Sequence, residues 1–136
     1  MEKLITMASN TSSINIGSFN SRGLNQSKRA YIVSLFSKLD ILFLHEHWLS
    51  DAQLAVLGNI AENVSYTGVS GFSSSDILTG RPYGGCAILW RSNLTMTVTE
   101  LDTGSNRICA VRFCSDSWKL ILHCVRKKSN PLCTIL

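Results

Sequence analysis

The sequence has no hydrophobic run near the roughly 18 residues that a membrane-spanning helix needs. Its first residues, Met1 to Thr6, lack the long apolar region of a secretory signal. We therefore expect an intracellular protein, nuclear or cytoplasmic, without a membrane partner. No Cys-x-x-Cys pair occurs and the cysteine count is five, which argues against a zinc knuckle or a disulfide framework. The cysteines are expected to be reduced and mostly buried.

The composition is that of a folded domain. The chain has 136 residues, of which 45% are hydrophobic and 16% are charged, so it can form one domain with a real core. There is no internal repeat and no linker that would divide it. The formal net charge of +4 mildly favours a polyanionic partner such as nucleic acid.

The hydrophobic pattern predicts alternating strands and helices followed by several strands. Ile32, Leu35, Phe36 and Leu39 form the apolar stripe of a helix that begins near Asn25 or Ser27. A short helix is predicted over residues 52–57. Strands are predicted over residues 14–20, 41–44, 64–69, 86–90, 94–101, 108–113 and 119–124.

These elements predict an α/β or α+β sandwich with buried central strands. The continuous apolar run over residues 41–44 suits a strand that is covered on both faces. Ser92 and Asn93 are expected to form a hairpin turn. Residues 1–13 are expected to be a flexible lead-in, residues 14–124 the domain, and residues 125–136 a divergent tail.

Glu46 carries the strongest functional signal. A carboxylate directly after a strongly apolar strand is costly unless a cation meets it, and Mg²⁺ prefers such oxygen ligands. The alternative is a salt bridge with Arg107 or Arg112. Asn20 ends the first predicted strand in the same way, so its amide could join a metal or phosphate site, or it could simply be a turn residue.

A second metal site is conceivable at the histidines that flank Glu46. His45 and His47 form a His-x-His pair, which binds zinc in several metal-dependent hydrolases. Such a site needs a further ligand, and His123 is the remaining histidine. The pair therefore predicts a zinc-dependent hydrolase only as an alternative to the Glu46 site.

Four segments, together with a helix that begins near Lys28 and Arg29, resemble a known family in their order. The four segments are residues 18–24 (Ser-Phe-Asn-Ser-Arg-Gly-Leu), 40–49 (Asp-Ile-Leu-Phe-Leu-His-Glu-His-Trp-Leu), 84–90 (Gly-Gly-Cys-Ala-Ile-Leu-Trp) and 105–108 (Ser-Asn-Arg-Ile). Over residues 14–124 the chain is similar to the endonuclease/exonuclease/phosphatase superfamily. It most resembles the endonuclease domain that precedes reverse transcriptase in LINE-type retrotransposons.

The resemblance implies both fold and chemistry. The family fold is a four-layer αββα sandwich, and its members cut phosphodiester or phosphate ester bonds with Mg²⁺ or Mn²⁺. Asn20 and Glu46 would then be catalytic residues that bind the metal, and Arg107 would contact a phosphate. DNA would be the partner of the parent domain.

The chain also departs from the family pattern. His45 stands where the family usually has Gln, and the family's Asp-x-Asn and Ser-Asp-His motifs are absent, as is a match for its catalytic Tyr. We therefore expect an inactive N-terminal portion of such an enzyme, a truncated retrotransposon copy or incomplete gene product, whose second sheet is largely absent. The alternative is a non-catalytic remnant that binds nucleic acid or protein.

Overall fold

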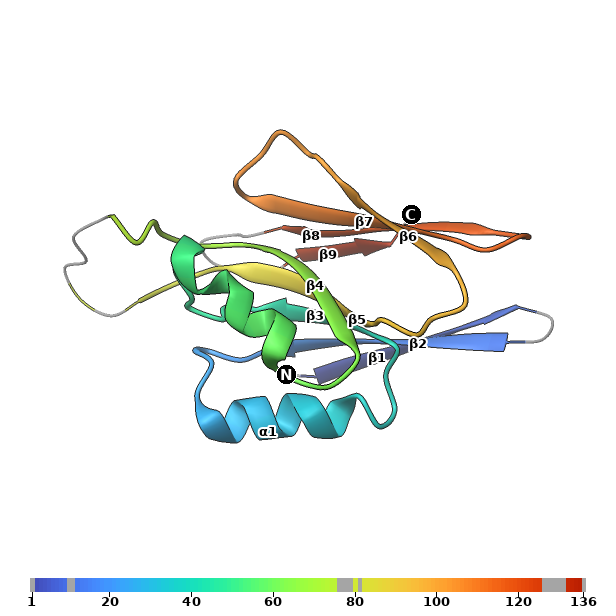
Figure 1. Cartoon of the computed structure of the whole chain (residues 1–136), viewed down its shortest axis with the longest axis horizontal. Helices are drawn as coiled ribbons and strands as arrows, with labels where there is room; N and C mark the ends of the chain where they lie inside the picture. Colours follow the sequence, from blue (N-terminus) through green and yellow to red (C-terminus); the bar gives the residue numbers. More distant parts are fainter. Residues whose placement is uncertain (1, 10–11, 76–79, 81, 126–131, 136) are drawn as a thin grey trace.

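Two stacked β-sheets and two helices make up the described part of the chain. The computed structural model describes residues 2–9, 12–75, 80, 82–125 and 132–135. A five-stranded sheet has the order β1-β2-β3-β5-β4, and a four-stranded sheet has the order β6-β7-β8-β9. In Figure 1 the four-stranded sheet lies above the five-stranded sheet, and α1 lies below the five-stranded sheet.

The elements of the first sheet alternate with the helices. They are β1 (Glu2–Ser9), β2 (Ser12–Asn20), α1 (Gln26–Leu35), β3 (Ile41–His45), η1 (Asp51–Asn59, a 3₁₀ helix), β4 (Val64–Val69) and β5 (Cys86–Arg91). The second sheet consists of β6 (Thr97–Leu101), β7 (Ile108–Cys114), β8 (Lys119–Val125) and β9 (Leu132–Ile135). Neither α1 nor η1, the helices of the described chain, is long and apolar enough to span a membrane.

Helix α1 is the crossover between two parallel strands, β2 and β3. Asn25 caps its N-terminus, because the Asn25 side chain accepts a hydrogen bond from the Lys28 amide (2.9 Å). The predicted apolar stripe is buried against the first sheet. After the helix, the Arg91 guanidinium donates to the carbonyls of Leu39 and Phe36, so β5 is tied to the end of α1.

Strand β3 separates two hydrophobic cores, as its continuous apolar run predicts. Ile41 and Phe43 face the second sheet, whereas Leu42 and Leu44 face the helices. Each side chain is at most 2% exposed. The predicted α/β class and the burial of this strand on both faces are thus confirmed.

We expected residues 1–13 to be a flexible lead-in, whereas the structure describes residues 2–9 as a strand. Residues 2–9 form β1, which pairs antiparallel with β2 from Glu2↔Phe19 to Ser9↔Ser12. Leu4 and Ile5 are 57% and 37% exposed, so neither face of this strand buries these apolar side chains as an alternating pattern would predict. Backbone hydrogen bonds to β2 hold β1 at the edge of the sheet. Such bonds do not depend on the side chains, so the sequence shows no alternation of apolar and polar residues from which the strand could be predicted.

The second sheet is also more complete than we expected. Its four strands form an antiparallel meander, and β9 lies within the segment predicted to be a divergent tail. No helix of the described chain covers its outer face, so the fold has three of the four layers of an αββα sandwich (Figure 1). The predicted hairpin at Ser92 and Asn93 is wrong, because the chain crosses there from one sheet to the other.

Candidate functional site

The predicted pair, Asn20 and Glu46, meets at the carboxyl ends of two parallel strands. Asn20 is paired with His45, and the side-chain amide of Asn20 donates to Glu46 Oε1 at 3.3 Å. The amide oxygen of Asn20 accepts the Arg22 backbone N–H at 3.2 Å. Asn20 therefore holds the Glu46 carboxylate in place, and both side chains are half-buried.

The backbone of Glu46 adopts a left-handed conformation that few non-glycine residues take, with φ of 52°. Its carbonyl accepts from the Gly23 amide (2.7 Å), and its own amide donates to the Gly85 carbonyl (2.8 Å). The buried Ser21 hydroxyl lies 3.1 Å from the same Glu46 carbonyl. These contacts from two other segments hold a backbone that costs about 1–3 kcal/mol, a pattern that is frequent at functional sites.

His47 is a structural residue and not a zinc ligand. Its Nδ1 accepts the Leu49 amide (3.0 Å), so Nε2 carries the proton and donates to the Val69 carbonyl (3.1 Å). Neither nitrogen has a lone pair left for a metal. Burial lowers the pKa of His47, which keeps the ring neutral at pH 7. The His45–His47 zinc hypothesis is therefore wrong.

The salt-bridge interpretation of Glu46 finds no support in the described chain. The ion pair found there joins Arg91 Nε to Asp40 Oδ1 at 3.5 Å. Asp40 directly precedes β3, at the end of the strand opposite to Glu46. Arg112 alternates on β7 with the buried Val111 and Phe113, so it faces the outer side of the second sheet.

The position of Arg107 is set by strand β7, which follows it directly. Arg107 is exposed, and its amide donates to Ser105 Oγ (3.1 Å). Two residues later the Cys109 thiol lies 3.9 Å from the carbonyl of Cys86, the strand partner of His45. Arg107 is therefore at the same end of the sandwich as Glu46.

The residues present fit a hard divalent cation. Glu46 offers a carboxylate at the rim of the sheet, and its described side-chain contact is a neutral amide. Mg²⁺ in proteins is usually held by one or two carboxylates, with water and substrate phosphate completing its shell. Glu46 can supply the carboxylate, and Asn20 can orient it.

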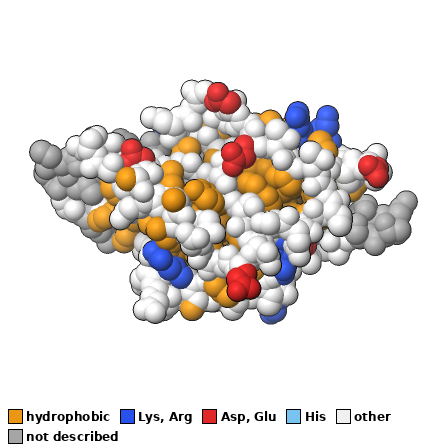
Figure 2. Space-filling view, in the orientation of Figure 1, with side chains coloured by type: hydrophobic (Ala, Val, Ile, Leu, Met, Phe, Trp, Pro, Cys, Tyr) orange, Lys and Arg blue, Asp and Glu red, His pale blue; other side chains and the backbone are white. Residues whose placement is uncertain are grey.

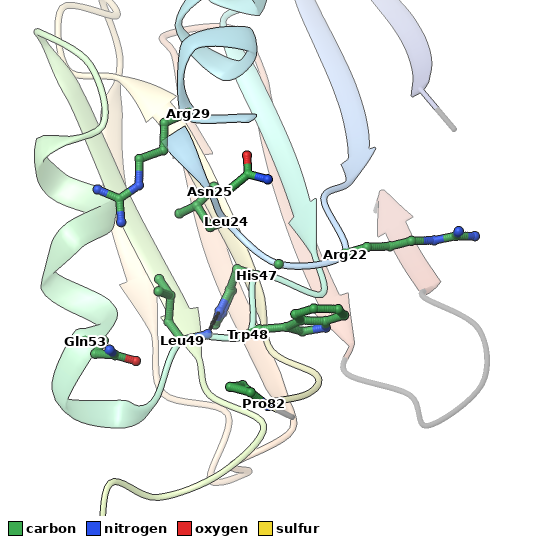
Figure 3. Close-up of a pocket in the computed structure, with 10 residues that line it drawn as sticks. Arg22, Leu24, Asn25, Arg29, His47, Trp48, Leu49, Gln53 and Pro82 are labelled. Carbon is green, nitrogen blue, oxygen red and sulfur yellow. Dashed lines mark hydrogen bonds between the residues drawn. The ribbon is translucent and has the colours of Figure 1, made fainter. Parts of the chain in front are cut away.

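We call the group formed by Asn20, Ser21, Gly23, Glu46 and Gly85 the Glu46 corner. A pocket of about 410 Å³ adjoins it. Arg22, Arg29, His47 and Trp48 are among its lining residues, and none of the described lining residues is acidic. Figure 3 shows Trp48 beside His47 and Pro82, with Arg29 reaching in from α1 and Arg22 extending away. The described lining of the pocket is thus basic, and it includes the large aromatic ring of Trp48.

Sequence reasoning missed several residues that build this corner. Ser21 is 1% exposed, and its hydroxyl donates to the Glu46 carbonyl. A pattern of hydrophobic residues cannot predict a buried polar side chain of this kind. Trp48 lies against Gly23, where an added Cβ would come within 2.5 Å of the indole ring. For Ser21, the signal that could have found it is the density of Asn, Ser and Gly at the end of β2, over residues 20–25.

The fold and this corner together define an α/β sandwich with a carboxylate at the ends of its central parallel strands. The model of the Endonuclease/Exonuclease/phosphatase family matches residues 12–121, and the chain belongs to that family. A search of curated proteins gave no match to the sequence. The superfamily that the motifs indicate is therefore confirmed.

Proposed function

We propose that this chain is the N-terminal part of a Mg²⁺-dependent phosphodiesterase domain that acts on DNA. The observation that carries the proposal is the Glu46 carboxylate, which Asn20 holds at the carboxyl ends of two parallel strands. Family membership supports a nuclease or phosphodiesterase fold. Within the family, the order of its motifs favours the LINE-type retrotransposon endonucleases.

Each residue has a defined task in this proposal. A bound Mg²⁺ would offset charge on the phosphate that is attacked. Glu46 would bind the cation, and the Asn20 amide would fix the rotamer of the carboxylate. Ser21 and the Gly85 carbonyl keep the Glu46 backbone in the conformation that presents it. Arg107, at the same end of the sandwich, would contact a phosphate oxygen.

The basic pocket supports a polyanionic substrate. Arg22 and Arg29 can contact phosphates, and an aromatic ring such as Trp48 can stack on an unpaired base. Base stacking on a side chain typically contributes about 1–3 kcal/mol. The pocket would therefore position nucleic acid beside Glu46, without a requirement for any one sequence.

We propose further that residues 1–136 alone do not cut DNA efficiently. The sequence holds no Asp-x-Asn and no Ser-Asp-His motif, so the Asp-His pair that activates water in the family is missing from it. General acid–base catalysis typically contributes about 10²- to 10⁴-fold. The chain would retain metal and DNA binding while lacking that contribution.

A paired binding and nicking experiment tests the proposal. We expect Mg²⁺ to strengthen binding to a fluorescent DNA duplex several-fold, and the Glu46→Gln variant to lose that gain. The matched control is Glu62→Gln, because Glu62 is exposed and precedes β4 at the opposite end of the first sheet. Supercoiled plasmid incubated with Mg²⁺ and wild-type protein is expected to stay intact.

Two results would contradict parts of this account. Rapid nicking that Glu46→Gln abolishes would show that the site is right and the inactivity wrong. Salt-sensitive DNA binding that is unchanged by both Mg²⁺ and Glu46→Gln would favour a non-catalytic nucleic-acid-binding module instead.

A further inference from the structure

Three cysteines from three strands meet in the core between the sheets. Cys86 lies on β5, Cys109 on β7 and Cys124 on β8, and their sulfur atoms all lie within 4.8 Å of one another. Each residue is at most 4% exposed. The sequence separates these cysteines by more than ten residues, so no short spacing motif reveals the cluster.

A histidine on a fourth strand lies beside the cluster. His45 is paired with Cys86 in the first sheet, and Cys109 is paired with Cys124 in the second. The two pairs face each other across the core, and His45 Nδ1 lies 3.7 Å from Cys124 Sγ. His45 follows Ile41 and Phe43 on the inner face of β3, and it is 3% exposed. Three mutually close thiols thus lie between the sheets, and a histidine nitrogen lies beside one of them.

We infer that these three thiols, together with His45 Nδ1, bind one Zn²⁺ between the two sheets. Structural zinc sites are tetrahedral with sulfur and nitrogen ligands, and a Cys₃His set is one of the common ones. Zn–S bonds of about 2.3 Å and Zn–N bonds of about 2.0–2.1 Å put neighbouring ligand atoms roughly 3.5–3.8 Å apart. The His45–Cys124 distance already has this value, whereas the three sulfurs must close by about 1 Å and His45 must also move toward the rest of the cluster.

The binding step is an exchange of protons for metal. Three S–H bonds break, three protons pass to solvent, and Zn²⁺ accepts one electron pair from each thiolate and one from His45 Nδ1. No oxidant or reductant takes part. Because the site lies inside the sandwich, the ion would enter while the two sheets come together during folding. Zinc would then cross-link the sheets and hold the end of β3 just before Glu46.

This inference is independent of the function proposed for Glu46. The zinc ligands lie on the inner side of β3, and they are soft sulfur and nitrogen atoms. Glu46 offers a hard oxygen donor at the rim of the sheet, and such donors suit Mg²⁺ or Mn²⁺. A zinc-binding protein with no Mg²⁺ affinity, or the reverse, would therefore separate the two proposals.

Refolding the full chain with metal tests the inference. The reduced protein is refolded with one equivalent of Zn²⁺ or Co²⁺, passed over a gel-filtration column, and assayed for metal and thermal stability. We expect one retained ion per chain, a higher Tm than in protein refolded with a chelator, and a Co²⁺ absorption spectrum typical of tetrahedral thiolate ligation. Cys109→Ala and Cys124→Ala are each expected to lose the ion.

Two controls keep the result interpretable. Cys114→Ala should retain the metal, because Cys114 is half-buried on the outer face of β7. Glu46→Gln should also retain zinc. Wild-type protein that folds by circular dichroism and holds no metal would overturn the inference, as would a Cys109–Cys124 disulfide in place of the ion. Equal retention by wild type and a Cys109→Ala/Cys124→Ala double variant would overturn it as well.

Discussion

Replacing Phe113 with alanine is expected to lower the free energy of unfolding by about 3–5 kcal/mol. Phe113 is fully buried on β7, and its ring meets the Trp90 ring of β5 edge-on, with centroids 5.9 Å apart. Removing the phenyl group leaves a cavity where the two sheets touch. Urea denaturation followed by circular dichroism measures the loss.

Ile121→Ala is the matched control for the sheet packing. Ile121 lies on β8 beside Arg112, and it alternates with the buried Leu120 and Leu122, so it faces the uncovered side of the second sheet. Its truncation is expected to cost about 1 kcal/mol, as is common outside a core. Similar losses for Phe113→Ala and Ile121→Ala would contradict the packing of the second sheet on the first.

Gly85→Ala is expected to cost about 2–4 kcal/mol, because it combines two penalties. Gly85 has a φ of 89°, a conformation that glycine adopts freely and alanine does not. An added Cβ would also lie 2.2 Å from Cε1 of His47, a buried ring that is held by two hydrogen bonds. The ring must shift, and the corner that carries Glu46 shifts with it.

Gly104→Ala separates the backbone cost from the clash. Gly104 has a φ of 66°, and an added Cβ there meets nothing within 4 Å. Its replacement by alanine is expected to cost only the backbone penalty, about 1–2 kcal/mol. If the two variants unfold at the same urea concentration, the close packing of Gly85 on His47 is not a constraint on this corner.

Local hydrophobic pattern was sufficient for much of the fold. The apolar run at 41–44 predicted a strand covered on both faces, and the stripe from Ile32 to Leu39 predicted the buried face of a helix. The family motifs predicted that Asn20 and Glu46 lie in one site. They lie side by side because the carboxyl ends of the parallel strands β2 and β3 meet at the same edge of the sheet. These features depend on residues close in sequence or on one crossover.

Features that depend on strand pairing could not be predicted. An exposed edge strand such as β1 has little burial to create a period, and β5 and β6 gave no sign that they belong to different sheets. The cluster of Cys86, Cys109 and Cys124 exists only because β5 faces β7 and β8 across the core. Pairing and stacking join residues that no sequence spacing relates.

The most direct test of the central claim is whether Glu46 binds a divalent metal. Electron paramagnetic resonance can measure Mn²⁺ binding at this site, because Mn²⁺ prefers oxygen ligands and binds the thiols of the cysteine cluster poorly. Wild-type protein and the Glu62→Gln control are expected to bind one Mn²⁺ with the same affinity, and Glu46→Gln is expected to lose that binding. Equal Mn²⁺ affinity in all three proteins would contradict the assignment of Glu46 as the metal ligand.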